Sequence, residues 1–422
     1  MFDRDSWQEI WHTLKKNRLR TFLTAFGVFW GIFMLIIMLG SGRGLENGVK
    51  YDMGNFASNS FFVWAQRTSM PYKGFPRGRF FNFRNADIQA LRDNIPEIEY
   101  IAPKIRGWSA GDGTNNTVRK DKTGAFSIMG EYPEWIKIDP MIMMQGRFIN
   151  EIDIRDNRKV AVIGTRVREV LFEPDEDPIG DYIRIQGVYF RVVGVFSALN
   201  SNISFGGEKE QSIFLPFTTL QKTYNYGDVV GWFSITSDKD YPASYVEEKA
   251  LRLLAQRHSI HPDDKEALGH FNLEEEFNQM NGLFNGISGL IWVVGIGTLL
   301  AGVIGISNIM LVIVRERTKE IGIQRALGAT PGKIMTQIIT ESIFLTSVAG
   351  YLGLVFGIAL IELINYLLVQ SGGEGQFFRH PEVDLNVALT ALAILVVSGA
   401  LAGLIPATRA IRIRPIDALR DE

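Results

Sequence analysis

The chain contains no cysteine among its 422 residues. Disulfide frameworks, thiol nucleophiles and thiolate zinc sites are therefore excluded. The sequence also lacks an excess of basic residues, because 44 Lys and Arg stand against 46 Asp and Glu, giving a formal net charge of −2. A nucleic-acid-binding protein would show a basic surplus, so we expect no nucleic-acid partner.

Charged residues are absent from four long apolar segments, which lie at 21–39, 277–314, 342–361 and 385–408. A helix that crosses the hydrocarbon core of a bilayer needs about 20 mainly apolar residues. A buried helix of a soluble protein normally keeps a polar face. The first segment is longer than the apolar region of a signal peptide, about 7–15 residues, so we interpret it as an uncleaved anchor. We therefore predict an integral membrane α-helical protein with four transmembrane helices, at 21–40, 283–314, 334–365 and 385–406.

Lys and Arg alternate between the segments that flank these helices. They are frequent before the first, between the second and third, and after the fourth, whereas residues 366–384 contain only Arg379. Short cytoplasmic loops are enriched in Lys and Arg. Both termini are therefore predicted to be cytoplasmic, with 407–422 as a cytoplasmic tail, 366–384 as a short periplasmic loop and 41–282 as a large domain outside the membrane. Residues 1–20 predict an amphipathic helix on the cytoplasmic surface of the lipid bilayer, or alternatively an extension of the first span.

The region between the first two spans predicts an α+β domain organised as two lobes. Short β-prone runs bounded by turn residues occur at 60–64, 98–105, 126–129, 159–163, 182–185, 190–196 and 212–215. Apolar residues recur with helical spacing at 85–94, 165–172 and 243–256. The polar, aromatic stretch 67–83 is predicted to be a mobile loop, and 275–286 a helix that continues into the second span.

Candidate catalytic and metal-binding patterns in this domain are weak. His258 and His261 could bind a metal with Asp263 or Asp264, but Pro262 is typical of a turn in which polar residues are solvated. We expect neither a catalytic nor a metal site, and the chain is not predicted to be an enzyme.

Glycine pairs at small-xxx-small spacing occur in every predicted span. Such spacing lets helix backbones approach closely within a bilayer. The predicted packing residues are Gly27 and Gly31, Gly297 and Gly305 with Ala301 between them, Gly353 and Gly357, and Gly399 and Gly403.

The segment 315–333 between the second and third spans is short and highly charged. Ile323, Ala326 and Leu327 would share one face of a short helix, and Gly328 suits its C-terminal cap. Such a helix can bind a cytoplasmic partner; alternatively, the segment is a solvated basic loop that only sets orientation. Residues 328–333 do not fit a phosphate-binding loop, because the glycine spacing is one residue short and Ile334 replaces the Ser or Thr that binds Mg²⁺.

Several motifs together resemble the MacB/FtsX-type permeases of ABC transporters. The segments Glu316–Gly322 and Arg325–Ala329 resemble the cytoplasmic loop of that family, and residues 406–420 and 16–24 resemble its two termini. Within the large domain, 146–148, 160–164, 171–180 and 190–195 are similar to the MacB periplasmic core domain.

The resemblance implies a bacterial inner-membrane permease subunit that transmits ATPase motion to a periplasmic domain for export or extrusion. It implies no cofactor on this chain, because ATP-Mg is bound by a dimeric cytoplasmic ABC ATPase on a separate chain. Further implied partners are a second permease copy or paralogue and, in some systems, a membrane-fusion protein and an outer-membrane channel. The alternatives are a lipoprotein-releasing permease and an FtsX-like signal transducer that does not transport. The implied coupling residues are Glu316, Arg317, Lys319, Glu320, Ile321, Arg325 and Leu327.

Polar residues within or near the spans are candidates for function. We expect Glu341 to lie at the cytoplasmic interface, and Glu362 with Asn365 at the outer one. The alternative for Glu341 is a coupling carboxylate that pairs with a basic residue of the loop. Asn308 is expected to donate or accept a hydrogen bond with a neighbouring helix.

Overall fold

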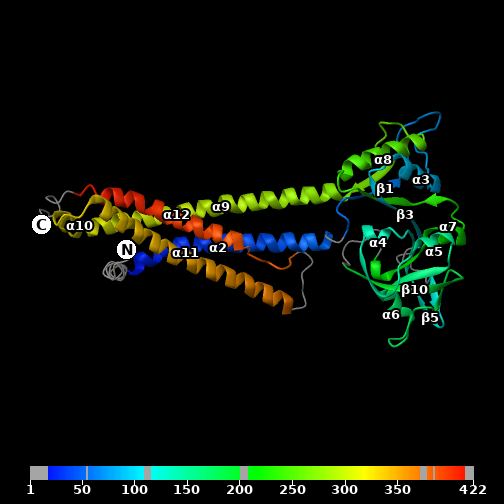
Figure 1. Cartoon of the computed structure of the whole chain (residues 1–422), viewed down its shortest axis with the longest axis horizontal. Helices are drawn as coiled ribbons and strands as arrows, with labels where there is room; N and C mark the ends of the chain where they lie inside the picture. The colour runs from blue at the N-terminus through cyan, green and yellow to red at the C-terminus, as the bar shows by residue number, and fades with distance from the viewer. Residues whose placement is uncertain are drawn as a thin grey trace. The chain divides into compact units, whose positions relative to one another are not determined.

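A computed structural model describes residues 18–53, 56–108, 116–199, 208–370, 378–383 and 385–413. Most of the predicted amphipathic helix at 1–20 and the tail beyond residue 413 lie outside these ranges. The chain divides into two compact units. One consists of Met1–Val49 with Gly282–Glu422, and the other of Lys50–Asn281. The first unit is helical and the second is a mixed α/β domain (Figure 1).

The helical unit is built from four long apolar helices and one short helix among the described residues. Its helices, two of which continue into the other unit, are α2 (Arg18–Met53), α9 (Leu273–Glu316), α10 (Thr318–Ala326), α11 (Pro331–Gln370) and α12 (Leu385–Ala410). Among the described residues, all of these except α10 are long and apolar enough to cross a membrane. The prediction of four candidate transmembrane helices, with an α/β domain between the first and the second, is therefore confirmed.

These helices are longer than the predicted spans. Helix α2 continues to Met53 rather than ending at residue 40, and α9 begins at Leu273, ten residues before the predicted start of the second span. The length of an apolar segment matches the thickness of the hydrocarbon core of the bilayer. The helix that contains this segment can continue through polar residues on either side. With a rise of about 1.5 Å per residue, α9 is about 66 Å long and α11 about 60 Å. Both are about twice the hydrocarbon thickness of about 30 Å. The predicted helix at 275–286, which continues into the second span, is confirmed.

Glycines mark several of the closest approaches between helices. A Cβ on Gly353 of α11 would lie 2.5 Å from the carbonyl oxygen of Phe29 in α2, and one on Gly403 of α12 would lie 3.0 Å from the Cα of Ile339 in α11. The remaining predicted glycines with a neighbouring helix nearby are Gly27, Gly31, Gly357 and Gly399.

Gly297 and Gly305 do not take part in this packing, because no described atom lies within 4 Å of a Cβ added to either. Gly295 and Gly302 of α9 contact α2 instead, through Leu35 and Val28. These two glycines are seven residues apart and therefore lie on nearly the same face of a helix. Small-xxx-small spacing identified the glycine-rich helix but selected the wrong face of it.

The other unit contains a long curved ladder of strands. Along this ladder the order is β14-β1-β13-β3-β6-β11-β8-β10-β9-β4-β5, with β7 paired to β10, while β12 and β2 form a separate pair. The strands are β1 (Ser60–Ala65), β2 (Phe83–Arg84), β3 (Ile98–Trp108), β4 (Thr117–Arg119), β5 (Lys122–Gly124), β6 (Ser127–Glu131), β7 (Met141–Gly146), β8 (Val160–Gly164), β9 (Tyr182–Ile185), β10 (Val188–Ala198), β11 (Ser212–Pro216), β12 (Val229–Val230), β13 (Trp232–Ser237) and β14 (Leu268–Asn272).

Short helices cover the ladder. They are α3 (Asn85–Asn94), α4 (Trp135–Ile138), α5 (Glu151–Arg155), α6 (Thr165–Leu171), α7 (Phe217–Thr223) and α8 (Ala243–Arg257), with a 3-10 turn η2 at Lys209–Gln211. The three helices predicted from periodicity correspond to α3, α6 and α8. The other three helices, α4, α5 and α7, were not predicted, because they carry too few turns for a periodic signal.

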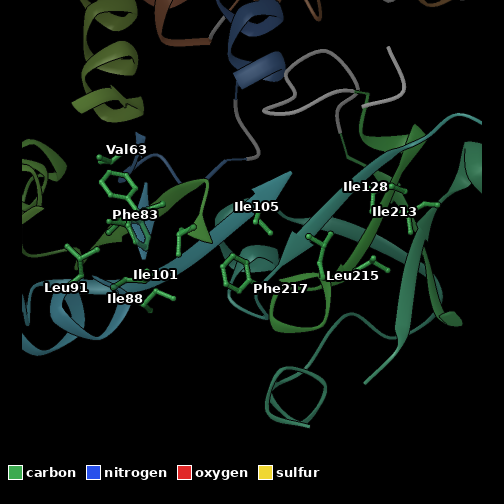
Figure 2. Packing of buried hydrophobic residues seen from close by; sticks show 14 of the residues in the cluster. Val63, Phe83, Ile88, Leu91, Ile101, Ile105, Ile128, Ile213, Leu215 and Phe217 are labelled. Atoms are coloured by element: carbon green, nitrogen blue, oxygen red, sulfur yellow. The ribbon is translucent and has the colours of Figure 1, made fainter. Parts of the chain in front are cut away.

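Strand β3 joins two lobes of the domain. Its first part pairs with β13, up to Lys104 opposite Trp232, and its second part pairs with β6, starting at Ile105 opposite Gly130. Figure 2 shows Ile105 between two groups of buried side chains, one containing Val63, Phe83 and Ile101 and the other Ile128, Ile213 and Leu215. One apolar core thus continues through both lobes.

Charged side chains are buried close to this junction. Lys104 lies 2.9 Å from Glu131, and Lys209 lies 2.7 Å from Asp139, with all four side chains less than a tenth exposed. The Lys104 ammonium also lies 3.1 Å from the centroid of the Trp135 ring, a cation–π contact. Burial raises the pKa of Glu131 to about 7 despite its attraction to Lys104. Within each pair, the attraction between the two charges offsets the free-energy cost of removing them from water. A single buried charge would bear that cost without compensation.

Candidate functional site

Helix α10 lies in the sharp connection between α9 and α11. The amide of Arg317 still bonds to the carbonyl of Ile313, at 3.0 Å, and the chain then turns into α10 at Thr318. The Thr318 hydroxyl donates to the carbonyl of Arg315 at 2.7 Å, which satisfies one of the last carbonyls of α9. A short helix at the predicted position is therefore present.

A glycine cap ends α10 as the sequence predicted. Gly328 has a φ of +96°, a left-handed conformation that glycine adopts without strain. The amide of Ala329 donates to Gln324 at 3.0 Å and that of Gly328 to Arg325 at 3.1 Å, the pair of bonds of a Schellman motif. The Thr330 carbonyl accepts from Lys333 at 3.0 Å, so α11 starts immediately at Pro331. This tight geometry fixes the direction of α10 between its neighbours.

One side of α10 is packed into the helical unit. Ile321 is buried in a cluster that includes Met310 and Ile313 of α9 and Ile334 and Ile338 of α11. The opposite side is exposed and apolar. Its members are Ile323, Ala326 and Leu327, and Leu327 is 84% exposed. The predicted common face of these three residues is present and is open in this chain.

An ion pair joins the start of α10 to the interior of α11. Arg317 Nη1 lies 3.6 Å from Oε2 of Glu341, whose side chain is only 1% exposed. Arg317 Nε also donates to Glu320 at 2.9 Å. A small cavity of about 20 Å³ lies beside these residues, enough for about one water molecule. Arg317 folds back over Glu341, so the pairing of Glu341 with a basic residue of the loop, the alternative that the sequence left open, is the one observed.

Arg325 joins α10 to the end of α12. Its guanidinium Nη1 donates to the carbonyl of Ile411 at 2.8 Å and also to the carbonyl of Ile413. Both carbonyls lie in the turn directly after Ala410, where α12 ends. The partial negative charge at the C-terminal end of a helix makes a guanidinium a favourable partner there. Sequence reasoning selected Arg325 only as part of a motif. Its inward role could not be found from the sequence, since it depends on where α12 ends.

The predicted coupling residues thus separate into two groups. Arg317, Ile321, Arg325 and Glu341 face inward and attach α10 to its neighbours, and Glu320 borders them. Glu316, Lys319 and Leu327 are exposed. Of the other polar residues near the spans, Glu362 is exposed on α11.

The His and Asp side chains of the weak metal-binding pattern in the α/β domain contact other protein groups in the structure. His258 Nε2 lies 2.8 Å from Oδ2 of Asp87. His261 accepts from the amide of Asp263 at 3.1 Å, and Asp264 accepts from the amide and hydroxyl of Ser69, both at 2.8 Å. Within the described residues, no group of three or more His, Asp or Glu side chains is arranged to hold a metal ion.

Comparison with known proteins gives two family matches that together span most of the chain. Residues 21–248 match the MacB-like periplasmic core domain, and residues 292–415 match the FtsX-like permease C-terminal domain.

Curated relatives match across almost the whole chain. The pyoverdine export ATP-binding/permease protein PvdT of Pseudomonas putida is 30% identical over 419 residues, covering 99% of this chain and 60% of that protein. The macrolide export ATP-binding/permease protein MacB of a Shewanella species is 27% identical, covering 97% of this chain and 59% of that protein. The chain therefore spans about 60% of the length of these relatives.

A solved structure of the periplasmic region of MacB from Actinobacillus actinomycetemcomitans aligns with a TM-score of 0.43 at 16% identity, covering 55% of this chain and 96% of that one. The first family match covers more than half of the chain, and the second covers the helices that follow. The chain belongs to the family of permeases that combine a MacB-like periplasmic core domain with an FtsX-like permease C-terminal domain.

Proposed function

We propose that this chain is the permease of a MacB-type ABC transporter in a bacterial inner membrane. In this proposal an ABC ATPase binds α10 on the cytoplasmic side, and its motion passes along α9 and α11 to the periplasmic domain, which acts on a substrate. The relatives are named as export proteins, which favours export over lipoprotein release or signalling.

The observation that carries the proposal is the two-sided character of α10. On its inner side Ile321 packs against α9 and α11, Glu341 pairs with Arg317, and Arg325 bonds to the end of α12. A displacement of α10 must therefore move three long helices with it. On its outer side Ile323 and Leu327 offer an apolar surface, the kind of anchor that fills a pocket on a partner protein.

The central experiment replaces Leu327 by Asp and tests co-purification of the permease with candidate ABC ATPases. We expect co-purification of the ATPase to be lost, because a carboxylate placed in an apolar pocket is desolvated without a partner. Leu327→Met should retain binding. A matched control is Phe80→Asp, which introduces the same charge at an exposed apolar position of the other unit and should leave the ATPase bound. Retained binding and retained coupled ATP turnover in Leu327→Asp would show that α10 is not the docking helix.

The proposed orientation places both termini and α10 in the cytoplasm. It can be tested directly because the chain has no native cysteine. Cysteines introduced singly at Asn157 and Thr330 would be treated in intact cells with a thiol reagent that cannot cross the membrane. We expect labelling at Asn157→Cys only. The reverse pattern would place the α/β domain in the cytoplasm.

The proposed assembly is a dimeric ATPase with two permease copies or a permease and its paralogue, with ATP-Mg bound by the ATPase. A membrane-fusion protein and an outer-membrane channel are further proposed partners. Copy number can be measured as the mass of the purified complex in detergent.

A further inference from the structure

The connection between β1 and β2 forms an unusual surface on the α/β domain. We call residues 66–82 the aromatic–basic loop. It contains Arg67, Lys73, Arg77 and Arg79 but no Asp or Glu, and it also carries Met70, Tyr72, Phe75, Phe80 and Phe81. The sequence predicts a mobile loop here, because polar and aromatic residues alternate without a regular period.

The structure shows instead a loop whose backbone is held at its tip and its base. At the tip, Tyr72 and Phe75 exchange two backbone hydrogen bonds of 3.1 and 2.9 Å. Lys73 and Gly74 between them both have positive φ values, 46° and 84°, as in a two-residue type I′ turn. Lower down, the amide of Thr68 donates to the carbonyl of Arg79 at 3.1 Å. The loop is therefore a short hairpin-like projection.

Two long-range contacts fix this projection to the rest of the domain. The buried carboxylate of Asp264 accepts from the amide and hydroxyl of Ser69 and from the amide of Met70, at 2.8 to 3.1 Å. Burial alone would raise the pKa of Asp264, but these hydrogen bonds hold it below its usual value. Arg79 donates to the carbonyl of Ser259 at 3.1 Å, and its guanidinium lies 4.2 Å from the centroid of the Phe75 ring.

The outer surface of the loop combines exposed cations with exposed apolar side chains. Phe80 is 63% exposed, and Met70 and Phe75 are also exposed. Arg67, Lys73 and Arg77 are exposed, and within the described residues they carry no ion pair. Exposed Phe and Met side chains thus lie beside three cations without an ion pair, forming a mixed apolar and basic patch that stays open to water in this chain.

We propose that the aromatic–basic loop is a docking surface for an acidic protein segment that also carries apolar side chains. The three unpaired cations supply the charge that an acidic segment complements, while Met, Phe and Arg are residues enriched at the centres of protein interfaces. Because the loop is already ordered, little conformational entropy is lost on binding. A membrane surface is the less favoured partner, since interfacial anchoring typically uses an amphipathic helix and this loop contains none.

The test uses the full-length permease in detergent and a defined fluorescent peptide that alternates Glu with Leu. Binding is measured by fluorescence anisotropy at low and high salt. Two control peptides replace Glu by Gln, or Leu by Gly. We expect the Glu–Leu peptide to bind more tightly than both controls, and added salt to weaken its binding.

The decisive variant is Arg67→Gln/Lys73→Gln/Arg77→Gln, which should weaken binding about tenfold if each exposed ion pair contributes about 0.5 kcal/mol. Phe80→Ser should weaken it independently. The matched control is Arg184→Gln/Tyr189→Ser, which removes an exposed cation and an exposed aromatic ring that face each other on β9 and β10 and should leave binding unchanged. Equal thermal melting of all variants verifies that each is folded.

Three results would overturn the proposal. They are the absence of binding to the native chain, equal binding by the triple variant, and equal binding of the Gln and Glu peptides. A parallel measurement uses vesicles of phosphatidylglycerol with phosphatidylcholine. Loop-dependent binding to these vesicles without peptide binding would assign the surface to the membrane instead. None of these results bears on the role of α10, which is tested separately with Leu327.

Discussion

Arg317 and Glu341 form an ion pair that links the first turn of α10 to the buried face of α11, with Nη1 and Oε2 3.6 Å apart. Glu341 is 24 residues further along the chain, on the helix that returns across the unit. The pair lies beside the apolar packing of Ile321. Apolar packing and an ion pair therefore both hold α10 at this end of the helical unit. Movement of α10 without α11 would separate a buried carboxylate from its cation, at a cost of several kcal/mol.

Glu341→Gln is predicted to uncouple the permease without releasing the ATPase. The variant removes the charge that holds Arg317 against α11, while Arg317 keeps its ion pair with Glu320. We therefore expect a slightly lower melting temperature and reduced stimulation of ATP turnover by transport. Co-purification of the ATPase should persist, because the outer face of α10 is untouched. Glu362→Gln, at an exposed carboxylate of the same helix, is the control. Unchanged coupling in Glu341→Gln would restrict the pair to a structural role.

Gly353→Ala should destabilise the helical unit while Gly297→Ala should not. A Cβ at Gly353 would lie 2.5 Å from the carbonyl oxygen of Phe29, whereas no described atom lies within 4 Å of one at Gly297. Overpacking of this kind typically costs about 1–3 kcal/mol. Thermal unfolding of the two variants in the same detergent measures the difference. Equal melting temperatures would contradict the observed approach of α11 to α2.

Asp264→Asn should loosen the aromatic–basic loop. The neutral amide cannot accept as strongly from Ser69 and Met70, and loss of hydrogen bonds to a charged acceptor costs about 1.5–3 kcal/mol. Hydrogen exchange at residues 66–82 should accelerate, while exchange in β8 should not change. If the amides at 66–82 keep the protection against exchange that they have in the native chain, contacts other than those of Asp264 order the loop.

Acid should have a related effect on the native chain. Hydrogen bonds hold the pKa of Asp264 below its usual value of 3.8, so the folded state binds the proton less readily than the unfolded state does. The stabilising contribution is therefore fully present above pH 3.8 and is lost as the pH falls through the lower folded pKa. The protection of the amides at 66–82, taken relative to their intrinsic exchange rates at each pH, should fall over that acidic range in the native chain. In Asp264→Asn this step should be absent.

Replacing Glu131 alone should lower the stability of the domain, whereas replacing Lys104 and Glu131 together should largely restore it. Glu131→Leu alone leaves a buried ammonium whose carboxylate partner is gone and should destabilise the domain by about 3–5 kcal/mol. In Lys104→Met/Glu131→Leu both charges are removed, and stability should recover to within about 1 kcal/mol or exceed the native value. Chemical unfolding followed by tryptophan fluorescence measures both. An additive double variant would show that the two charges do not stabilise each other.

Much of the fold was accessible from the sequence because the signals were local. The helix predicted at 85–94 coincides with α3, and the strand at 182–185 coincides with β9. The strands β13 and β14 were missed. Strand β13 places Ser234, Thr236 and Ser237 at buried positions, so it has neither the alternation of a half-buried strand nor the apolar run of a buried one. Its central place depends on pairing with distant β1 and β3.

The candidate site was predicted only in part for the same reason. The motif identified α10, its cap at Gly328 and its exposed apolar face, since all of these depend on residues within one or two turns. The pairing of Glu341 was only one of two alternatives, because spacing along α11 does not reveal that Arg317 lies over it. Arg325 likewise acts on carbonyls of Ile411 and Ile413, more than 80 residues away.

The sequence by itself determined that this protein has four apolar helices, a charged connection between the second and third, and a mixed α/β domain after the first. Those properties follow from the length of apolar segments and from local periodicity. Neither of these depends on contacts with residues that are distant along the chain. Tertiary structure alone decided which glycines meet another helix, that Glu341 is paired, and that the loop at 66–82 is ordered. Each of these depends on atoms brought together from distant parts of the chain, where burial changes the energy of a charge or a close approach.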